Sequence, residues 1–197
     1  AVFRQAQVDA RAQAVAQAAA AQVMRHDVVA VELQILARCE LLLQEEVDAA
    51  VQEADKRGFQ IASHAIGDLA IERIVRALGK TSQKTLHRVE HCEFASDETV
   101  DEIAKKGYAV MAQPGYSWID QRFLHTYDRY LTQESLKLMK FKTYVDKGIC
   151  ICGSSDSPVQ SLDPWLQMLG MVQFYREEES VTPYEAFSCY TINPARA

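Results

Sequence analysis

The chain has 197 residues, 48% of them hydrophobic, and this length suits one well-buried domain better than two large ones. Its formal net charge is -6 at pH 7 and its basic residues are scattered, which excludes the basic surface of a nucleic-acid-binding protein. The sequence contains no run of roughly 18 apolar residues that could cross a bilayer and no secretory signal pattern. We therefore expect a cytoplasmic protein with no nucleic-acid partner and no membrane partner.

The cysteines number five and form no C-x-x-C pair, so they are interpreted as reduced, mostly buried thiols. Residues 1–40 are rich in alanine and glutamine and contain no glycine or proline. High alanine content favours a helix, but alanine gives that helix little apolar surface to bury. The segment is predicted to be an Ala-rich N-terminal helix of open role, and residues 41–197 are predicted to form a separate domain.

From residue 41 onward, helical stretches alternate with short apolar runs, and a glycine follows most of the helices. The pattern predicts strands over residues 59–64, 85–91, 108–113 and 149–153. It predicts helices over residues 44–56, 68–78, 97–106, 132–147, 164–176 and 183–190. Four strands separated by helices indicate an α/β fold with a parallel sheet and right-handed crossovers. Composition alone fits either a small open sheet or four strands of an eight-stranded barrel.

Three predicted strands end in, or just before, a residue that can bind a metal ion: His64, His91 and Asp156. In parallel α/β folds the reactive groups gather at the carboxyl ends of the strands. Two imidazoles and a carboxylate suit Zn²⁺ or a similar divalent ion, and fewer than four protein ligands leave a position for water. A metal lowers the pKa of that water, and a nearby carboxylate can accept its proton.

Each of these residues also has a structural interpretation, since a single histidine that closes a strand is more often hydrogen-bonded than metal-bound. His87 is expected deeper on the same strand face as His91, and Glu90 on the opposite face. Asp68 fits equally well as an N-cap of its helix or as a residue that reaches the substrate. Gln113 could donate a hydrogen bond to the substrate or brace a loop.

Four short segments contain these residues in order along the chain: His-Ala-Ile-Gly-Asp at 64–68, His-Arg-Val-Glu-His at 87–91, Ala-Gln-Pro at 112–114 and Gly-Ser-Ser-Asp-Ser-Pro-Val at 153–159. In order and spacing they resemble the second half of the amidohydrolase family 3 proteins. The closing segment 190–195 is also similar to the family pattern. The resemblance covers residues 41–197.

The resemblance implies a partial TIM (β/α)8 barrel that consists of the fifth to eighth strands. It implies that His64 and His91 are metal ligands and that Asp156 is both ligand and general base. It further implies hydrolysis of amide-like C–N bonds in a small-molecule substrate, with one or two zinc ions as cofactor. A non-catalytic barrel fragment or scaffold is the alternative, and an open-sheet binding protein without metal is a third, weaker interpretation.

The sequence departs from the family pattern in its first part. The His-x-His pair of the family's first strand and the bridging ligand of its fourth strand have no counterpart here, as expected of an excerpt from a longer protein. Few ligands predict weak metal binding. Open barrel edges and an apolar inner face predict a homo-oligomer. The aromatic segment 116–130 is expected either to form a pocket rim or to cover an apolar edge.

Overall fold

The computed structural model describes residues 30–33, 43–82, 85–115 and 140–197. Most of the predicted Ala-rich helix, namely residues 1–29 and 34–40, lies outside these residues, as do the aromatic segment 116–130 and the first part of the helix predicted over 132–147. The described strands form one parallel sheet in the order β1-β2-β3-β4-β5. Their bounds are Ala30–Leu33 (β1), Gln60–Ala65 (β2), Arg88–His91 (β3), Ala109–Ala112 (β4) and Cys150–Gly153 (β5).

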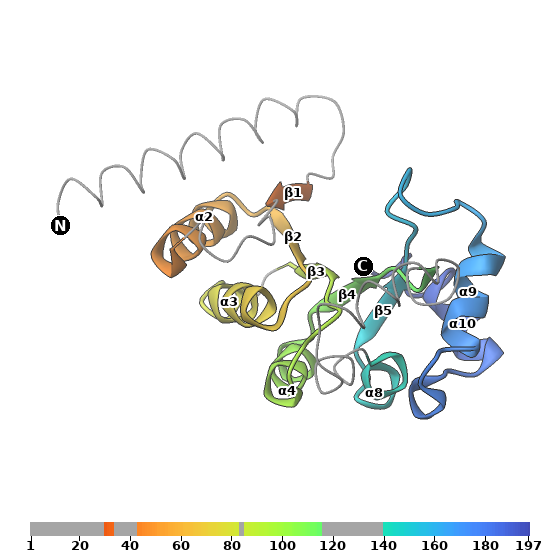
Figure 1. Ribbon diagram of the computed structural model, residues 1–197. Coiled ribbons are helices and arrows are strands. Elements are labelled where there is room, and N and C mark those ends of the chain that lie inside the picture. The colour runs from red at the N-terminus through yellow and green to blue at the C-terminus, as the bar shows by residue number, and fades with distance from the viewer. Residues whose placement is uncertain (1–29, 34–42, 83–84, 116–139) are drawn as a thin grey trace, which may run out of the picture.

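The helices follow the strands along the chain. They are α2 (Gln44–Lys56), α3 (Asp68–Leu78), α4 (Asp97–Lys106), α8 (Phe141–Asp146), α9 (Pro164–Val172), the short 3-10 helix η1 (Glu177–Glu179) and α10 (Pro183–Cys189). Figure 1 shows α2, α3, α4 and α8 along one side of the strands. Within the described parts of the chain, no helix combines the length and apolarity needed to span a bilayer.

Every strand pairs in parallel with the next strand in sequence. An open doubly wound sheet reverses its strand order at one point, whereas consecutive strands with helices on the outer face form an arc of a (β/α)8 barrel. The observed order therefore confirms the predicted α/β fold and partial barrel.

Two elements differ from the sequence prediction. Strand β1 lies in the Ala-rich segment, where no strand was expected, and Val31 pairs with Ile61 of β2. Its four residues are too few to stand out by periodicity. Helix α9 ends at Val172 instead of residue 176, because Gln173 leaves the helical conformation and the next residue, Phe174, packs against Phe141 with ring centroids 4.8 Å apart.

The core lies between the sheet and its helices. One residue from each of four neighbouring strands is completely buried on this face: Ile61, Val89, Val110 and Ile151. The helices contribute a matching apolar stripe to the same cluster: Val47, Val51, Ile71, Ile74, Leu78, Val100 and Ile103. Burying aliphatic side chains of this size contributes about 1.5–3 kcal/mol each, so this layer holds the strands in register.

The opposite face of the sheet corresponds to a barrel interior. Its register rows are Ala62, Arg88, Ala109 and Cys150, then His64, Glu90, Met111 and Cys152. Arg88 Nε and Glu90 Oε1 form an ion pair at 2.9 Å. The expectation of an apolar inner face was therefore wrong, because histidine and paired charges occupy the middle of this face. The chain end also contacts this layer, since Gln60 Nε2 donates to Ala197 O at 2.8 Å.

Candidate metal centre

The predicted site residues lie at the carboxyl end of the sheet. His64 is the fifth residue of β2, His91 is the last residue of β3, and Gln113 follows β4 directly. Asp156 lies three residues beyond β5. Because parallel strands end at the same edge, four loops supply these side chains from one side of the sheet.

The imidazoles of His64 and His91 contact each other, with ring centroids 4.3 Å apart and ring planes at 72°. The strand register alone does not predict this contact, because His64 pairs with Glu90, and His91 pairs with Ala65 of the helix-facing row. The backbone of His91 has a φ of 68°, in the left-handed region. This break in the strand conformation turns the His91 ring towards His64.

The position of Glu90 corrects one sequence-based assignment. Glu90 was expected to face away from the site, because strict alternation was assumed through His91. In the structure Glu90 is the register partner of His64 and lies on the same sheet face. The alternation fails at His91 itself, which a periodicity argument cannot detect.

A buried carboxylate lies next to the histidine pair. His91 Nδ1 and Glu93 Oε1 are 3.8 Å apart, and the two side chains are only 6% and 7% exposed. A carboxylate in this position can orient a ligand histidine. Sequence analysis missed Glu93, since an acidic residue after a strand carries no signal of its own.

Asp156 lies in a tight turn after β5 and is exposed. Its backbone has a φ of 50°, and its carbonyl accepts a hydrogen bond from Val159 N at 2.8 Å. Across the residues that the structure describes, no three His, Cys, Asp or Glu side chains form a group that could hold a metal ion. The structure thus brings two of the three predicted ligands together and does not gather Asp156 with them.

Gln113 is 6% exposed and ties the ends of β4 and β5 together. Its Nε2 donates to Ser154 Oγ at 2.9 Å, and Ser154 N donates to Ala112 O at 2.8 Å. Its Oε1 is buried and has no hydrogen-bond partner among the described residues. Buried amide oxygens are nearly always paired, so this oxygen can accept a hydrogen bond from a bound molecule.

Asp68 is exposed and is the first residue of α3 rather than its N-cap, a position that Gly67 occupies. Its carboxylate accepts a hydrogen bond from Leu69 N at 2.7 Å. A carboxylate in the first turn interacts favourably with the helix dipole. Asp68 is therefore placed to stabilise α3, and its surface position leaves the carboxylate open to solvent.

The described cysteines are free thiols. Burial raises the pKa of the Cys92 and Cys189 thiols to about 12, and burial together with the neighbouring Cys150 raises that of Cys152 to about 12. Since the thiolate is the metal-binding form, these three groups are poor ligands at neutral pH. The candidate ligands are therefore the two imidazoles and nearby carboxylates.

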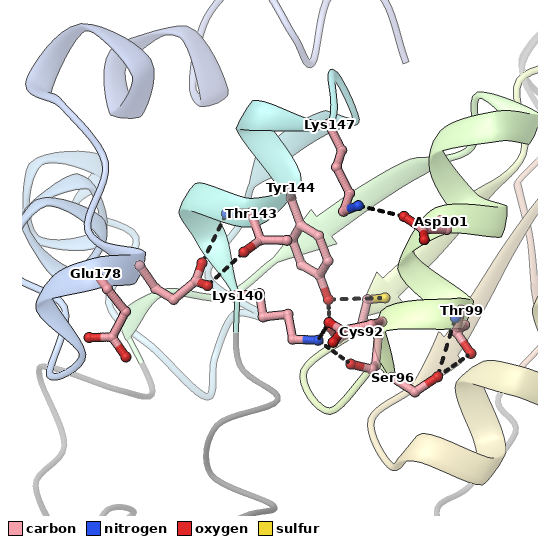
Figure 2. Close-up of polar contacts among 12 residues, drawn as sticks. Cys92, Ser96, Thr99, Asp101, Lys140, Thr143, Tyr144, Lys147 and Glu178 are labelled. Carbon is pink, nitrogen blue, oxygen red and sulfur yellow. Dashed lines mark hydrogen bonds and ion pairs between the residues drawn. The ribbon is translucent and has the colours of Figure 1, made fainter.

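Cys92, directly after His91, is part of a polar network between the β3–α4 loop and α8 (Figure 2). The Tyr144 hydroxyl donates to Cys92 O at 2.7 Å. Lys140 Nζ donates to Ala95 O at 3.2 Å and forms an ion pair with Asp97. The loop that follows His91 is thereby attached to α8 at two points.

The chemistry of the histidine pair fits a zinc-type ion. Neutral imidazole is a standard zinc ligand, and catalytic zinc sites typically have three protein ligands, the third often a carboxylate or another imidazole, with a water in the remaining position. Two rings in edge contact, next to a buried carboxylate, supply donors of the right type. The described residues thus provide part of a donor set.

Comparison with known proteins identifies the relatives of this chain. The profile of the "Amidohydrolase family" matches residues 5–197. The protein named "Putative amidohydrolase YtcJ" of Bacillus subtilis (strain 168) is 30% identical over 159 residues, which cover 75% of this chain and 30% of that protein. The N-substituted formamide deformylase of Arthrobacter pascens is 28% identical over 163 residues, covering 77% and 30%. The chain therefore spans about a third of the length of these relatives.

Solved structures have the same fold. An uncharacterized metal-dependent hydrolase from Pyrococcus furiosus superposes with a TM-score of 0.69 at 24% identity, over 79% of this chain and 32% of that one. A Xaa-Pro dipeptidase with methionine in its active site superposes with a TM-score of 0.56 at 22% identity, over 79% and 37%. At these identities the likeness establishes the shared fold.

Proposed function

The chain belongs to the amidohydrolase family, and from this membership we propose that it contributes to a metal-dependent hydrolase that cleaves amide-like C–N bonds of a small molecule. The observation that carries the proposal is the His64–His91 contact, which a left-handed turn at the end of β3 creates. A strained backbone that brings two potential ligands together is typical of a functional site.

In this proposal His64 and His91 hold a divalent metal, most simply Zn²⁺, and Asp156 joins them as ligand and proton acceptor. A bound zinc-type ion lowers the pKa of water towards 7 and polarises the substrate carbonyl. Asp156 accepts a proton from the attacking water and delivers it to the leaving nitrogen, so that amide and water become acid and amine. The turn at Asp156, with its φ of 50°, keeps the carboxylate outside the packed core.

Gln113 and Asp68 are proposed to bind the substrate. The Gln113 side chain is fixed by its bond to Ser154, which leaves the buried Oε1 to accept an N–H group. Asp68, the first residue of α3 and four residues after His64, offers a second acceptor. The arrangement favours a substrate with N–H donors near the scissile bond, as an amide has.

The test measures hydrolysis of N-substituted formamides by the zinc-loaded chain. These compounds are chosen because one relative is named an N-substituted formamide deformylase. Loss of the general base should lower kcat about 10²–10⁴-fold in Asp156→Asn. Asp163→Asn is the matched control, because Asp163 caps α9 through Trp165 N and asparagine caps equally well. Formate release that survives a chelator, or that Asp156→Asn leaves unchanged, would contradict the proposal.

We also propose a cytoplasmic location and association of copies through the sheet edges. The described free thiols fit a reducing compartment. Strands β1 and β5 each pair on one side only within the described residues, and an unpaired strand edge is a template for another chain. The non-catalytic fragment remains the alternative, and metal-binding measurements separate it from the enzyme.

A further inference from the structure

Two consecutive residues without the freedom of glycine, His91 and Cys92, adopt left-handed backbone conformations, with φ of 68° and 54°. Such conformations cost free energy for L-residues and persist only where the surroundings hold them. They are also what turns the His91 ring out of its register row towards His64. The groups that hold this turn therefore decide whether the two imidazoles meet.

Backbone bonds from β2 hold one side of the turn. Cys92 N donates to Ala65 O at 3.0 Å, and Phe94 N donates to Ile66 O at 3.1 Å. These bonds fix the amide after His91 against the end of β2. They do not involve the carbonyl oxygen of Cys92, whose orientation depends on a different partner.

That partner is Tyr144 of α8, whose hydroxyl donates to Cys92 O at 2.7 Å (Figure 2). The Tyr144 side chain is only 2% exposed, so water cannot readily replace this bond. Burial raises the pKa of the Tyr144 hydroxyl well above its usual value, which keeps the donor proton in place.

Helix α8 is itself fixed on both sides of Tyr144. Before it, Thr143 N and Oγ1 donate to the two carboxylate oxygens of Glu179 at 2.9 and 2.6 Å. After it, Lys147 forms an ion pair with Asp101 of α4 at 2.5 Å. The hydroxyl is thus presented to Cys92 from a fixed support rather than from a mobile side chain.

We propose that Tyr144 is a positioning residue for the metal centre: its bond to the Cys92 carbonyl locks the left-handed turn and thereby aims His91 at His64. The consequence for metal binding rests on the function proposed above. The consequence for the histidine contact does not, since that contact is formed by the protein alone. Tyr144 acts through the backbone and has no role in proton transfer.

Tyr144→Phe tests this by removing only the hydroxyl. Thr143→Val is the matched control: it removes one hydroxyl bond from the neighbouring residue of the same helix. It keeps the bond of the residue 143 amide to Glu179, the Lys147–Asp101 ion pair and the Tyr144 bond to Cys92 O, so the support of Tyr144 stays in place. In metal-free protein, the ring-proton NMR shifts of His64 and His91 report their edge contact. We expect these shifts to change in Tyr144→Phe and to stay at wild-type values in Thr143→Val.

A Co²⁺ titration followed by visible absorption supplies the second readout. Loss of a group that orients a metal ligand typically lowers metal affinity about 10–100-fold, and this is the loss expected for Tyr144→Phe with none for Thr143→Val. If Tyr144→Phe does not fold, both readouts are taken on Tyr144→Met, which also removes the hydroxyl bond to Cys92 O and has a flexible side chain that adapts to the buried site.

The outcomes separate the two proposals. If wild-type protein binds no Co²⁺, the proposed function fails, and the histidine ring shifts alone decide the role of Tyr144. Ring shifts that remain unchanged in Tyr144→Phe overturn the positioning role, as do equal changes in Thr143→Val. In Tyr144→Met, if it must be used, unchanged shifts overturn it equally.

Discussion

The buried histidine at position 87 illustrates how one side chain can couple stability to pH. His87 is fully buried, and its Nδ1 accepts a hydrogen bond from Ile61 N at 3.2 Å, which requires a neutral ring with its proton on Nε2. Burial lowers the pKa of His87 below 6.5, while Asp55 raises it by a smaller amount. The folded state therefore resists protonation more than the unfolded state does.

This difference predicts a loss of stability on acidification. Below pH 6.5 His87 binds a proton in the unfolded chain but stays neutral in the folded chain. The free energy of unfolding therefore falls as the pH falls from 6.5 towards the lowered pKa of His87 in the folded state. The slope from this one proton is at most about 1.4 kcal/mol per pH unit. Urea unfolding of wild type and His87→Gln between pH 7.5 and 5 measures it. If the unfolding free energy of the two proteins depends equally on pH, His87 is not the source of the acid sensitivity.

Gly153, at the end of β5, is required by packing. A Cβ added there would overlap the ring of Tyr190, whereas a Cβ added at Gly67 meets nothing within 4 Å. We therefore expect Gly153→Ala to lower the unfolding free energy by about 1–3 kcal/mol, the usual cost of overpacking. Gly67→Ser, which adds a Cβ and an N-cap hydroxyl to α3, should leave stability unchanged or slightly raised. Chemical denaturation measures the unfolding free energy of both variants. An equal change in the two variants would refute the packing explanation.

The sequence identified residue types but not these local conformations. His64 and His91 were predicted from their place at strand ends, and the structure brings their rings together. The left-handed turn at His91 and Cys92, the buried Glu93 and the Tyr144 contact arise from tertiary packing, which no periodicity contains. The packing of Tyr190 against Gly153 likewise could not be foreseen, because the two residues are far apart in the sequence.

At the scale of elements, caps define where helices begin. Ser96 accepts a hydrogen bond from Thr99 N at the start of α4. Helix α10 begins with a full capping box, in which Thr182 Oγ1 accepts from Glu185 N and Glu185 accepts from Thr182 N. Glycines end several helices as predicted, and Gly107 adopts the left-handed conformation (φ 71°) that favours glycine there.

The capping box predicts a measurable effect. Thr182→Ala removes the acceptor of the Glu185 amide and should lower the unfolding free energy by about 0.5–2 kcal/mol. Thr191→Ala is the control, because its exposed hydroxyl bonds only to Phe187 O within the same segment. Thermal denaturation followed by circular dichroism should show a lower midpoint for the first variant alone. Equal midpoints for both variants would argue against a stabilising cap.

Element types were readable from sequence because helix and strand periods differ and glycines mark the ends. Strand β1 was missed because four residues beside an Ala-rich stretch give no clear period. The polar inner face was also missed, since Arg88 and Glu90 neutralise each other only after β3 is in place.

At the scale of the whole molecule, β1 and β5 are the outermost described strands of a barrel arc. Association of copies through these edges predicts a solution mass of at least twice the 22.2 kDa of one chain. Light scattering coupled to size-exclusion chromatography, over a range of concentrations, measures it. A single species at the mass of one chain throughout would contradict the proposal.

The central claim is that His64 and His91 form part of a metal centre, and zinc content tests it most directly. Wild type, the double variant His64→Ala with His91→Ala, and the control His87→Gln are dialysed to equilibrium against micromolar zinc and analysed by plasma mass spectrometry. We predict zinc bound to wild type and to the control, and lost from the double variant. Wild-type protein without zinc, or a double variant that retains it, would contradict the claim and favour a non-catalytic barrel fragment.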